Sequence, residues 1–187
     1  HRQQRSVGGG PSTVGRQIGG CEDQWDNQGV MEIESDAVVS EDGLYRYRLS
    51  RRWGAGDQVT FVLLNPSTAD ATQDDRTLRR CIGFARRWGY AGLNVVNLYA
   101  YRATDPKALW QAPDPVGPAN DQYLQAAGAS GDLLVAGWGG HAKTQRVDEV
   151  MKIPGFDRIH YLRLTKSGQP RHPLYLSGDL TPTRWRS

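Results

Sequence analysis

The sequence has few of the features that mark secreted or membrane-spanning proteins. Its two cysteines, Cys21 and Cys81, are too few for a disulfide framework and lack metal-ligand spacing. No run approaches the roughly 18 apolar residues of a transmembrane helix, and the glycine-rich start lacks the apolar core of a secretory signal. We therefore predict a cytoplasmic protein that makes no use of a membrane.

Common catalytic motifs are absent as well. The chain has no GxxxxGK[ST] or GxGxxG loop for phosphates, no HExxH or CxxC for zinc, and no GxSxG nucleophile elbow. The stretch 137–140, Gly-Trp-Gly-Gly, is too short and too bulky for a dinucleotide loop. Asp74 and Asp75 could bind a metal ion, but their position favours capping of a helix N-terminus. We expect neither a metal nor a cofactor.

The composition is that of one ordinary domain. Of 187 residues, 38% are hydrophobic and 23% are charged, and the net charge is +3. This basic balance is compatible with a nucleic-acid partner without requiring one. Residues 1–30 hold seven glycines and almost no periodic apolar pattern, which predicts a disordered or vector-derived segment, with Met31 as the natural start. We predict a single, monomeric domain over 31–187.

Strand and helix patterns alternate beyond residue 43. The stretch 44–49 alternates with period two, which is typical of a half-exposed strand, whereas 59–64, 93–98, 133–136 and 158–164 read as buried strands. Helices are predicted at 74–88, 105–112, 118–128 and 141–152. This order predicts an α/β fold, a three-layer αβα sandwich around a central, mostly parallel four-stranded sheet. Sites in such sheets lie beyond the carboxyl ends of the strands.

Three polar side chains stand out at these strand ends. Asn65 follows a continuous apolar run and precedes a proline, Asn97 lies inside an apolar strand, and His172 lies between two prolines. The two amides could equally bond loop backbone, and a loop histidine is often an ordinary surface residue. His141 and His160 have no comparable setting, and we interpret them as ordinary.

Four segments resemble a bacterial and phage family described only as a domain of unknown function, number 1643. Its hallmarks are Asn-Pro-Ser-Thr-Ala-Asp, an Asp-Asp helix start, Asn-Leu-[Phe/Tyr]-Ala-Tyr-Arg and Pro-x-His-Pro-Leu-Tyr. They occur here at 65–70, 74–75, 97–102 and 170–175. Such membership implies no known activity.

A remoter resemblance, over roughly 59–177, is to the uracil-DNA glycosylase superfamily. Its motif Gly-Ile-Asn-Pro-Gly is similar to residues 63–67, its base-reading strand to 95–102, its Leu-Leu-Trp-Gly-x-x-Ala pattern to 134–142, and its His-Pro-Ser-Pro-Leu-Ser motif to 172–177. Ser67 replaces the glycine after the proline of the first motif, and Leu174 replaces the first serine of the last motif. These departures indicate a base other than plain uracil.

The remoter resemblance implies a metal-independent DNA N-glycosylase that flips a modified base and hydrolyses its N-glycosidic bond. Asn65 would orient the attacking water, His172 would donate a hydrogen bond to the departing base, and Asn97 would read the base edge. Tyr99 or Tyr101 would stack on the face of the base, Arg102 and Arg171 would bind phosphates, and Leu174 would fill the gap that the flipped base leaves in the duplex. Pro66 and Ser67 would belong to the substrate pocket. Asp70 and Asp75 are further candidates for polarising the water.

Two alternatives remain open from the sequence. The same base pocket would suit an enzyme that hydrolyses a free nucleotide or nucleoside, or exchanges its base. The fold would also suit a non-catalytic binder of modified DNA. A free-nucleotide enzyme should ignore oligonucleotides, whereas a binder should retard them and leave every base in place.

Overall fold

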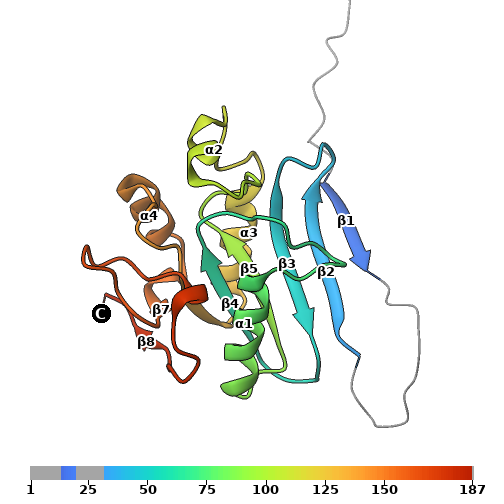
Figure 1. The fold of residues 1–187 in the computed structure, drawn as a ribbon, viewed down its shortest axis with the longest axis vertical. Helices are drawn as coiled ribbons and strands as arrows, with labels where there is room; N and C mark the ends of the chain where they lie inside the picture. Colours follow the sequence, from blue (N-terminus) through green and yellow to red (C-terminus); the bar gives the residue numbers. More distant parts are fainter. Residues whose placement is uncertain (1–13, 20–31, 187) are drawn as a thin grey trace, which may run out of the picture.

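One mixed β-sheet organises the residues that the computed structural model describes, 14–19 and 32–186 (Figure 1). Within these residues the sheet has eight strands in the order β1-β2-β3-β5-β4-β6-β7-β8. The strands are β1 (Val14–Gly19), β2 (Glu34–Ser40), β3 (Arg46–Arg52), β4 (Gln58–Leu63), β5 (Gly92–Asn97), β6 (Leu133–Ala136), β7 (His160–Tyr161) and β8 (Thr183–Arg184).

Four α-helices complete the described part of the chain: α1 (Arg76–Arg87), α2 (Pro106–Gln111), α3 (Asn120–Ala129) and α4 (Thr144–Met151). Two short 3₁₀ turns, η1 (Phe156–Arg158) and η2 (Pro173–Tyr175), lie near the C-terminus. The α/β class predicted from the sequence is confirmed. None of the helices among the described residues is long and apolar enough to span a membrane.

The sheet is larger than predicted because antiparallel strands extend a parallel centre. Strands β5, β4, β6 and β7 run parallel, β1 to β3 continue the sheet beyond β5, and β8 pairs antiparallel to β7. From β4 the chain passes to one side, to β5, and then returns past β4 to β6. The connections after β4 and β6 therefore lead in opposite directions, and a crevice is expected between the carboxyl ends of these two strands.

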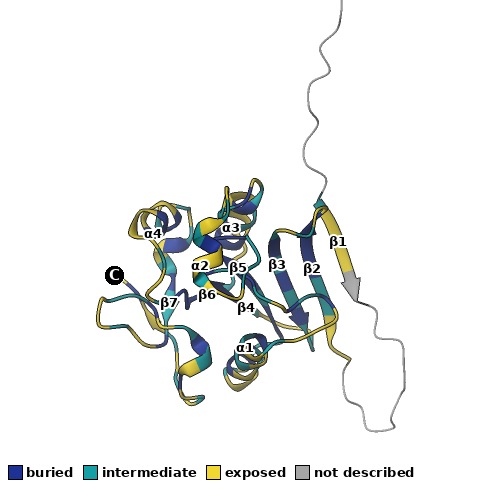
Figure 2. Cartoon of the chain, turned by 45° about the horizontal axis from the view of Figure 1, so that its top comes forward, coloured by how far each residue is buried: buried dark blue, intermediate teal, exposed yellow. Residues whose placement is uncertain are grey.

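Apolar residues alternate between the two faces of the central strands and form a core on each face. Phe61 and Val95 pack with α1, whereas Val62 and Val96 pack with α3 and α4. The helices therefore cover both faces, as expected from right-handed crossovers that run in opposite directions from β4 (Figure 1). Figure 2 shows the burial that results, with buried residues along the central strands and exposed residues on the outer sides of the helices.

Strand β1 differs from the prediction that residues 1–30 are disordered. Val14–Gly19 pairs antiparallel with β2 at the edge of the sheet. Edge pairing uses backbone groups on one side of a strand and needs no periodic apolar side chains, which explains why the glycine-rich sequence gave no signal. The rest of the predicted segment lies outside the described residues.

Candidate functional site

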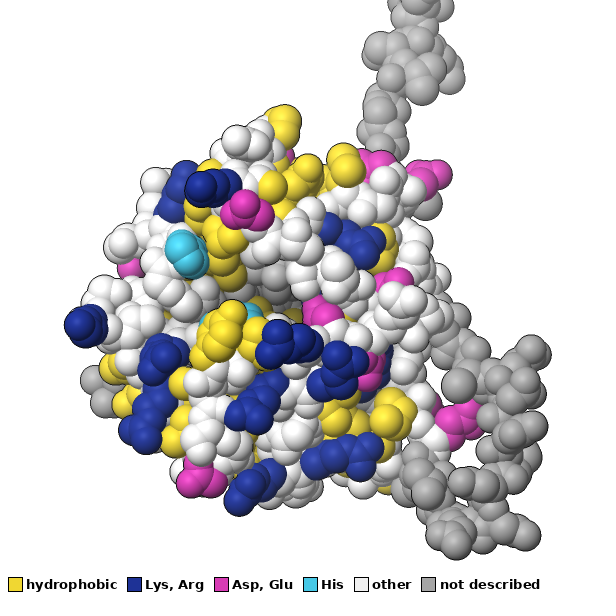
Figure 3. All heavy atoms as spheres, viewed as in Figure 1, with side chains coloured by type: hydrophobic (Ala, Val, Ile, Leu, Met, Phe, Trp, Pro, Cys, Tyr) yellow, Lys and Arg dark blue, Asp and Glu magenta, His cyan; other side chains and the backbone are white. Residues whose placement is uncertain are grey.

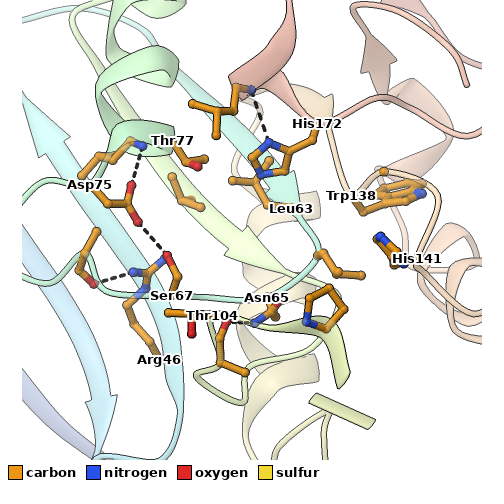
Figure 4. Close-up of a pocket in the computed structure, with 18 of the residues that line it drawn as sticks. Arg46, Leu63, Asn65, Ser67, Asp75, Thr77, Thr104, Trp138, His141 and His172 are labelled. Carbon is orange, nitrogen blue, oxygen red and sulfur yellow. Dashed lines mark hydrogen bonds between the residues drawn. The ribbon is translucent and has the colours of Figure 1, made fainter. Parts of the chain in front are cut away.

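A cavity of about 340 Å³ opens at the carboxyl edge of the parallel strands (Figure 4). It lies between the ends of β4 and β6, where the topology places a crevice. Its walls come from residues of β3 and β5, the end of β4 and the segment after it, residues 103–106, the loop after β6, the start of α1, and η2 with the residue before it. The volume is at the small end of ligand pockets, which suits a single ring system and its substituents.

Asn65 lines this cavity directly after β4. Its amide nitrogen donates to the carbonyl oxygens of Pro66, at 3.0 Å, and Ala103, at 2.7 Å. Because two backbone carbonyls occupy the nitrogen, the orientation of the amide is fixed. The side-chain oxygen makes no hydrogen bond to the described residues and remains a neutral acceptor at the cavity wall.

His172 lines the same cavity, although 107 positions separate it from Asn65 in the chain. Its Nδ1 accepts a hydrogen bond of 3.3 Å from the backbone N–H of Leu174. Burial lowers the pKa of His172, and the negative charge of Asp75 opposes part of this effect. The imidazole is therefore neutral at pH 7 with its proton on Nε2, which presents a donor to the cavity (Figure 4).

Close packing fixes the loop that carries His172. The backbone N–H of Gly139 donates to the Pro170 carbonyl at 2.7 Å, and the Trp138 indole donates to Gln169 at 2.9 Å. A Cβ at Gly137 would lie 2.8 Å from the Pro173 ring, so only glycine permits this approach. The loop after β6 thus determines where His172 stands.

Asp75 combines a structural role with a place in the cavity wall. As predicted, it caps α1: its Oδ1 accepts the Leu78 N–H at 2.8 Å, and its Oδ2 accepts the Ser67 hydroxyl at 2.8 Å. Ser67, another predicted substrate-binding residue, also lines the cavity. The start of α1 therefore faces the cavity with a negative charge that its own N–H groups stabilise.

Arg46 is a cavity residue that the sequence analysis missed. Its position in an alternating strand predicts a solvent-facing side chain like that of Arg48. A β-bulge at Tyr47 changes this: Val38 pairs with Arg48 and Val39 with Arg46, which leaves Tyr47 unpaired. Tyr47 stacks on Tyr123 of α3, and the Arg46 side chain turns to the opposite face, where it lines the cavity.

Arg46 is only 4% exposed, yet it has no ion pair with the described residues. Its Nη1 donates to the Ala69 carbonyl, while its buried Nε has no partner. Desolvation lowers the pKa of Arg46 to about 10, and the charge of Asp75 opposes this lowering. The guanidinium therefore remains charged at neutral pH.

Asn97 does not reach the cavity surface. It is 1% exposed at the end of β5, in register with Leu63 and on the same face of the sheet as Leu63 and Val95, which do line the cavity. Neither side-chain polar atom of Asn97 has a hydrogen-bond partner in the described structure. The structure therefore brings Asn65 and His172 together at one cavity, while Asn97 lies in the layer beneath.

The remaining predicted residues divide between the cavity and its surroundings. Leu174 lines the cavity, and so do the exposed Tyr175 and His141, neither of which was predicted as a site residue. Six of the remaining predicted residues lie outside the lining: Tyr99, Tyr101, Pro66, Asp70, Arg102 and Arg171. Tyr99 is buried against Trp110 on the other face of the sheet, Tyr101 packs on Tyr45, and Pro66 is buried. Asp70 caps a turn by accepting the backbone N–H groups of Thr72 and Gln73.

Basic side chains gather beside the opening. Figure 3 shows a hollow on this face, with Lys and Arg side chains below it over α1. Helix α1 contains no acidic residue and exposes Arg76, Arg79, Arg86 and Arg87. None of these four forms an ion pair with the described residues. In this part of the chain, no group of three or more His, Cys, Asp or Glu side chains is arranged to hold a metal ion.

The comparisons with known proteins agree with the nearer resemblance. Residues 46–174 match the family model described as "Protein of unknown function (DUF1643)". This match includes Asn65, Asp75 and His172, together with Arg46 at its first position. Neither a curated protein nor a solved structure matches the chain.

Proposed function

The chain belongs to the DUF1643 family of proteins of unknown function, and from the cavity that this family's segment encloses we propose that it is a DNA N-glycosylase. It would hydrolyse the bond between a flipped, modified base and its deoxyribose. The observation that supports this most is the meeting of Asn65 and His172 in one small cavity, one presenting an acceptor and the other a donor. The likeness to the uracil-DNA glycosylase superfamily is part of this proposal.

The reaction needs a base that can leave with the electron pair of the C1′–N bond. As the C1′–N bond breaks, positive charge develops on the sugar and negative charge on the base. The neutral His172 presents Nε2–H, which donates to a carbonyl oxygen of the base and stabilises this charge. Its Nδ1 is held by the Leu174 N–H, so the donor is oriented before the substrate enters.

Water completes the reaction at C1′. The free oxygen of Asn65 accepts one hydrogen bond from this water and so orients it toward the sugar. An amide is too weak a base to remove the proton, but an oxocarbenium-like sugar is electrophilic enough to react with neutral water. The proton is released as the bond to C1′ forms, and the departing base or solvent takes it up.

The surroundings of the cavity suit a DNA strand. The exposed arginines of α1 offer contacts to phosphates next to the flipped nucleotide. Tyr175 is 76% exposed at the mouth and lies 6.3 Å from the His172 ring, between ring centres. An exposed aromatic at this place can stack against the neighbouring base after flipping.

The test uses genomic DNAs of varied base modification and detects released bases by mass spectrometry. The wild-type protein should release at least one modified base, and His172→Ala should slow the release by about 10²–10³-fold. His160→Ala, a histidine outside the cavity lining, is the control and should retain the wild-type rate. Release from free nucleosides alone would favour a nucleoside hydrolase, and retardation of DNA without release would favour a binding protein; either result would overturn the proposal.

A further inference from the structure

The floor of the cavity, by which we mean the part lined by Arg46 and Leu49 of β3 and Val95 of β5, contains a charged group with no ion-pair partner among the described residues. Arg46 has five N–H donors, and its side chain makes one hydrogen bond to the described residues, to the Ala69 carbonyl. At 4% exposure such a charge is costly unless a partner or ordered water accepts its remaining hydrogen bonds. Two other buried arginines do have partners: Arg51 pairs with Asp74, and Arg146 pairs with Asp121.

Asp75 compensates the charge of Arg46 only in part, because the two side chains form no ion pair. It lines the same cavity, but it lies beyond 4.0 Å from Arg46. Its two carboxylate oxygens are already engaged by Ser67 and by the first turn of α1. The helix N-terminus stabilises this negative charge locally. Arg46 is therefore the buried cation of the cavity that has no ion-pair partner among the described residues.

Asn97 provides a second, independent observation at the same place. It faces the same side of the sheet as Leu63 and Val95 of the cavity wall, and both polar atoms of its amide are buried without a partner. Asn97 lies two residues after Val95 on β5. Val95 in turn pairs with Leu49 on β3, and the same strand carries Arg46. The polar groups beneath the cavity thus concentrate at the β3–β5 side of its floor.

We propose that Arg46 is a specificity-determining residue that binds a carboxylate substituent of the base. This inference rests on the proposed function and specifies its substrate class. Arg46 lines the cavity at only 4% exposure, so in this proposal it meets the edge of a flipped base that is farthest from the sugar. Backbone phosphates remain at the mouth, beside α1. The planar guanidinium fork matches a carboxylate in geometry, and no bond is formed or broken in this contact.

The binding test needs no catalysis. Three probes differ only at position 5 of the pyrimidine: 5-carboxy-2′-deoxycytidine, its methyl ester and unsubstituted 2′-deoxycytidine. The wild-type protein should bind the carboxylate about 10–100-fold more tightly than the ester, the range expected for a charge-assisted hydrogen bond. In ¹H–¹⁵N spectra, the carboxylate should shift the Arg46 Nε–H signal.

Arg46→Met should abolish the preference for the carboxylate. Arg48→Met, two residues along the same strand but on the opposite face, is the matched control and should keep it. If Arg46→Met does not fold, the wild-type comparison of carboxylate with ester still decides the question. Equal affinity of the wild-type protein for the carboxylate and the ester, or no binding of the carboxylate, would overturn this inference. So would a shift of the Arg46 Nε–H signal on addition of inorganic phosphate with no nucleoside present.

Failure of this inference and failure of the proposed function are distinguishable. Release of bases from DNA with no preference for a carboxylated base, at rates that Arg46→Met does not change, would reject the carboxylate pocket and keep the glycosylase. Binding of the carboxylate that depends on Arg46, without release of any base from DNA, would keep the pocket and reject the glycosylase.

Discussion

Replacing Gly137 by alanine should displace His172 through a single methyl group. The added Cβ would lie 2.8 Å from Cδ of Pro173 and 3.0 Å from Cδ2 of Leu63. Gly137 does not have a positive φ, so alanine strains no backbone angle there. The Leu63 side chain can rotate, but the Pro173 ring is rigid and follows His172 directly. The loop must therefore move outward.

The cost can be estimated from two opposing effects. Overpacking of a close contact costs about 1–3 kcal/mol, and replacing glycine by alanine restricts the unfolded chain and returns about 0.4–1 kcal/mol. The free energy of unfolding should therefore fall by about 0.5–2 kcal/mol. The matched control is Gly83→Ala within α1, where a Cβ meets no atom within 4 Å. It should raise stability by about 0.5–1 kcal/mol.

Urea denaturation measures both variants, and long-range ¹H–¹⁵N spectra of the imidazole report on His172. Gly137→Ala should lower the stability and weaken the Nε2–H tautomer as the contact between Nδ1 and Leu174 loosens. Gly83→Ala should leave the imidazole spectrum unchanged. If Gly137→Ala were as stable as the wild type, with an unaltered imidazole, close packing would not be what positions His172.

Three further predictions follow from individual contacts. Because burial lowers the pKa of His172, the unfolded chain binds a proton there more readily than the folded protein does below about pH 6.5. The stability of the wild type relative to His172→Gln should therefore fall as the pH is lowered from 7.5 to 5. A difference in urea midpoints that does not change with pH would contradict this. Asp75→Ala should cost about 1 kcal/mol through loss of the α1 cap, whereas Asp75→Asn should cost less because asparagine also caps; equal losses would rule out capping as the cause. Asp74→Ala should cost about 1–3 kcal/mol by removing the ion-pair partner of the buried Arg51, less than for a fully buried pair because Asp74 is 35% exposed; an unchanged thermal midpoint would show that the pair adds no stability.

Sequence patterns identified cavity residues at positions where a polar residue interrupts an apolar run. They missed a cavity residue where the strand is irregular. Asn65 could be predicted because four buried residues precede it, and the helix start at Asp75 because a carboxylate there meets free N–H groups. Arg46 could not be predicted, because the bulge at Tyr47 reverses the alternation that placed it in solvent. Only the pairing of β2 with β3 creates that bulge.

The antiparallel part of the sheet and the depth of Asn97 also required the structure. Strand β2 is held by backbone pairing to β3 and the edge strand β1 by pairing to β2, and their sequences alone carry no strong period-two signal. Asn97 was correctly placed in a strand near its end, but its depth depends on the neighbouring strand β3, which pairs with β5 as far as Leu49 and Val95. Strict alternation would put Tyr99, two positions on, on the same face as Asn97, but β5 ends at Asn97 and Tyr99 packs in the opposite core.

The measurement that bears most directly on the proposed hydrolysis counts both of its products in one reaction. An oligonucleotide that contains a base released in the mass-spectrometric screen is incubated with the protein, and free base and aldehyde-reactive abasic sites are quantified together. We predict one abasic site for each base released, with both products reduced about 10²–10³-fold by His172→Ala. Free base without abasic sites, or an intact oligonucleotide after prolonged incubation, would contradict the account.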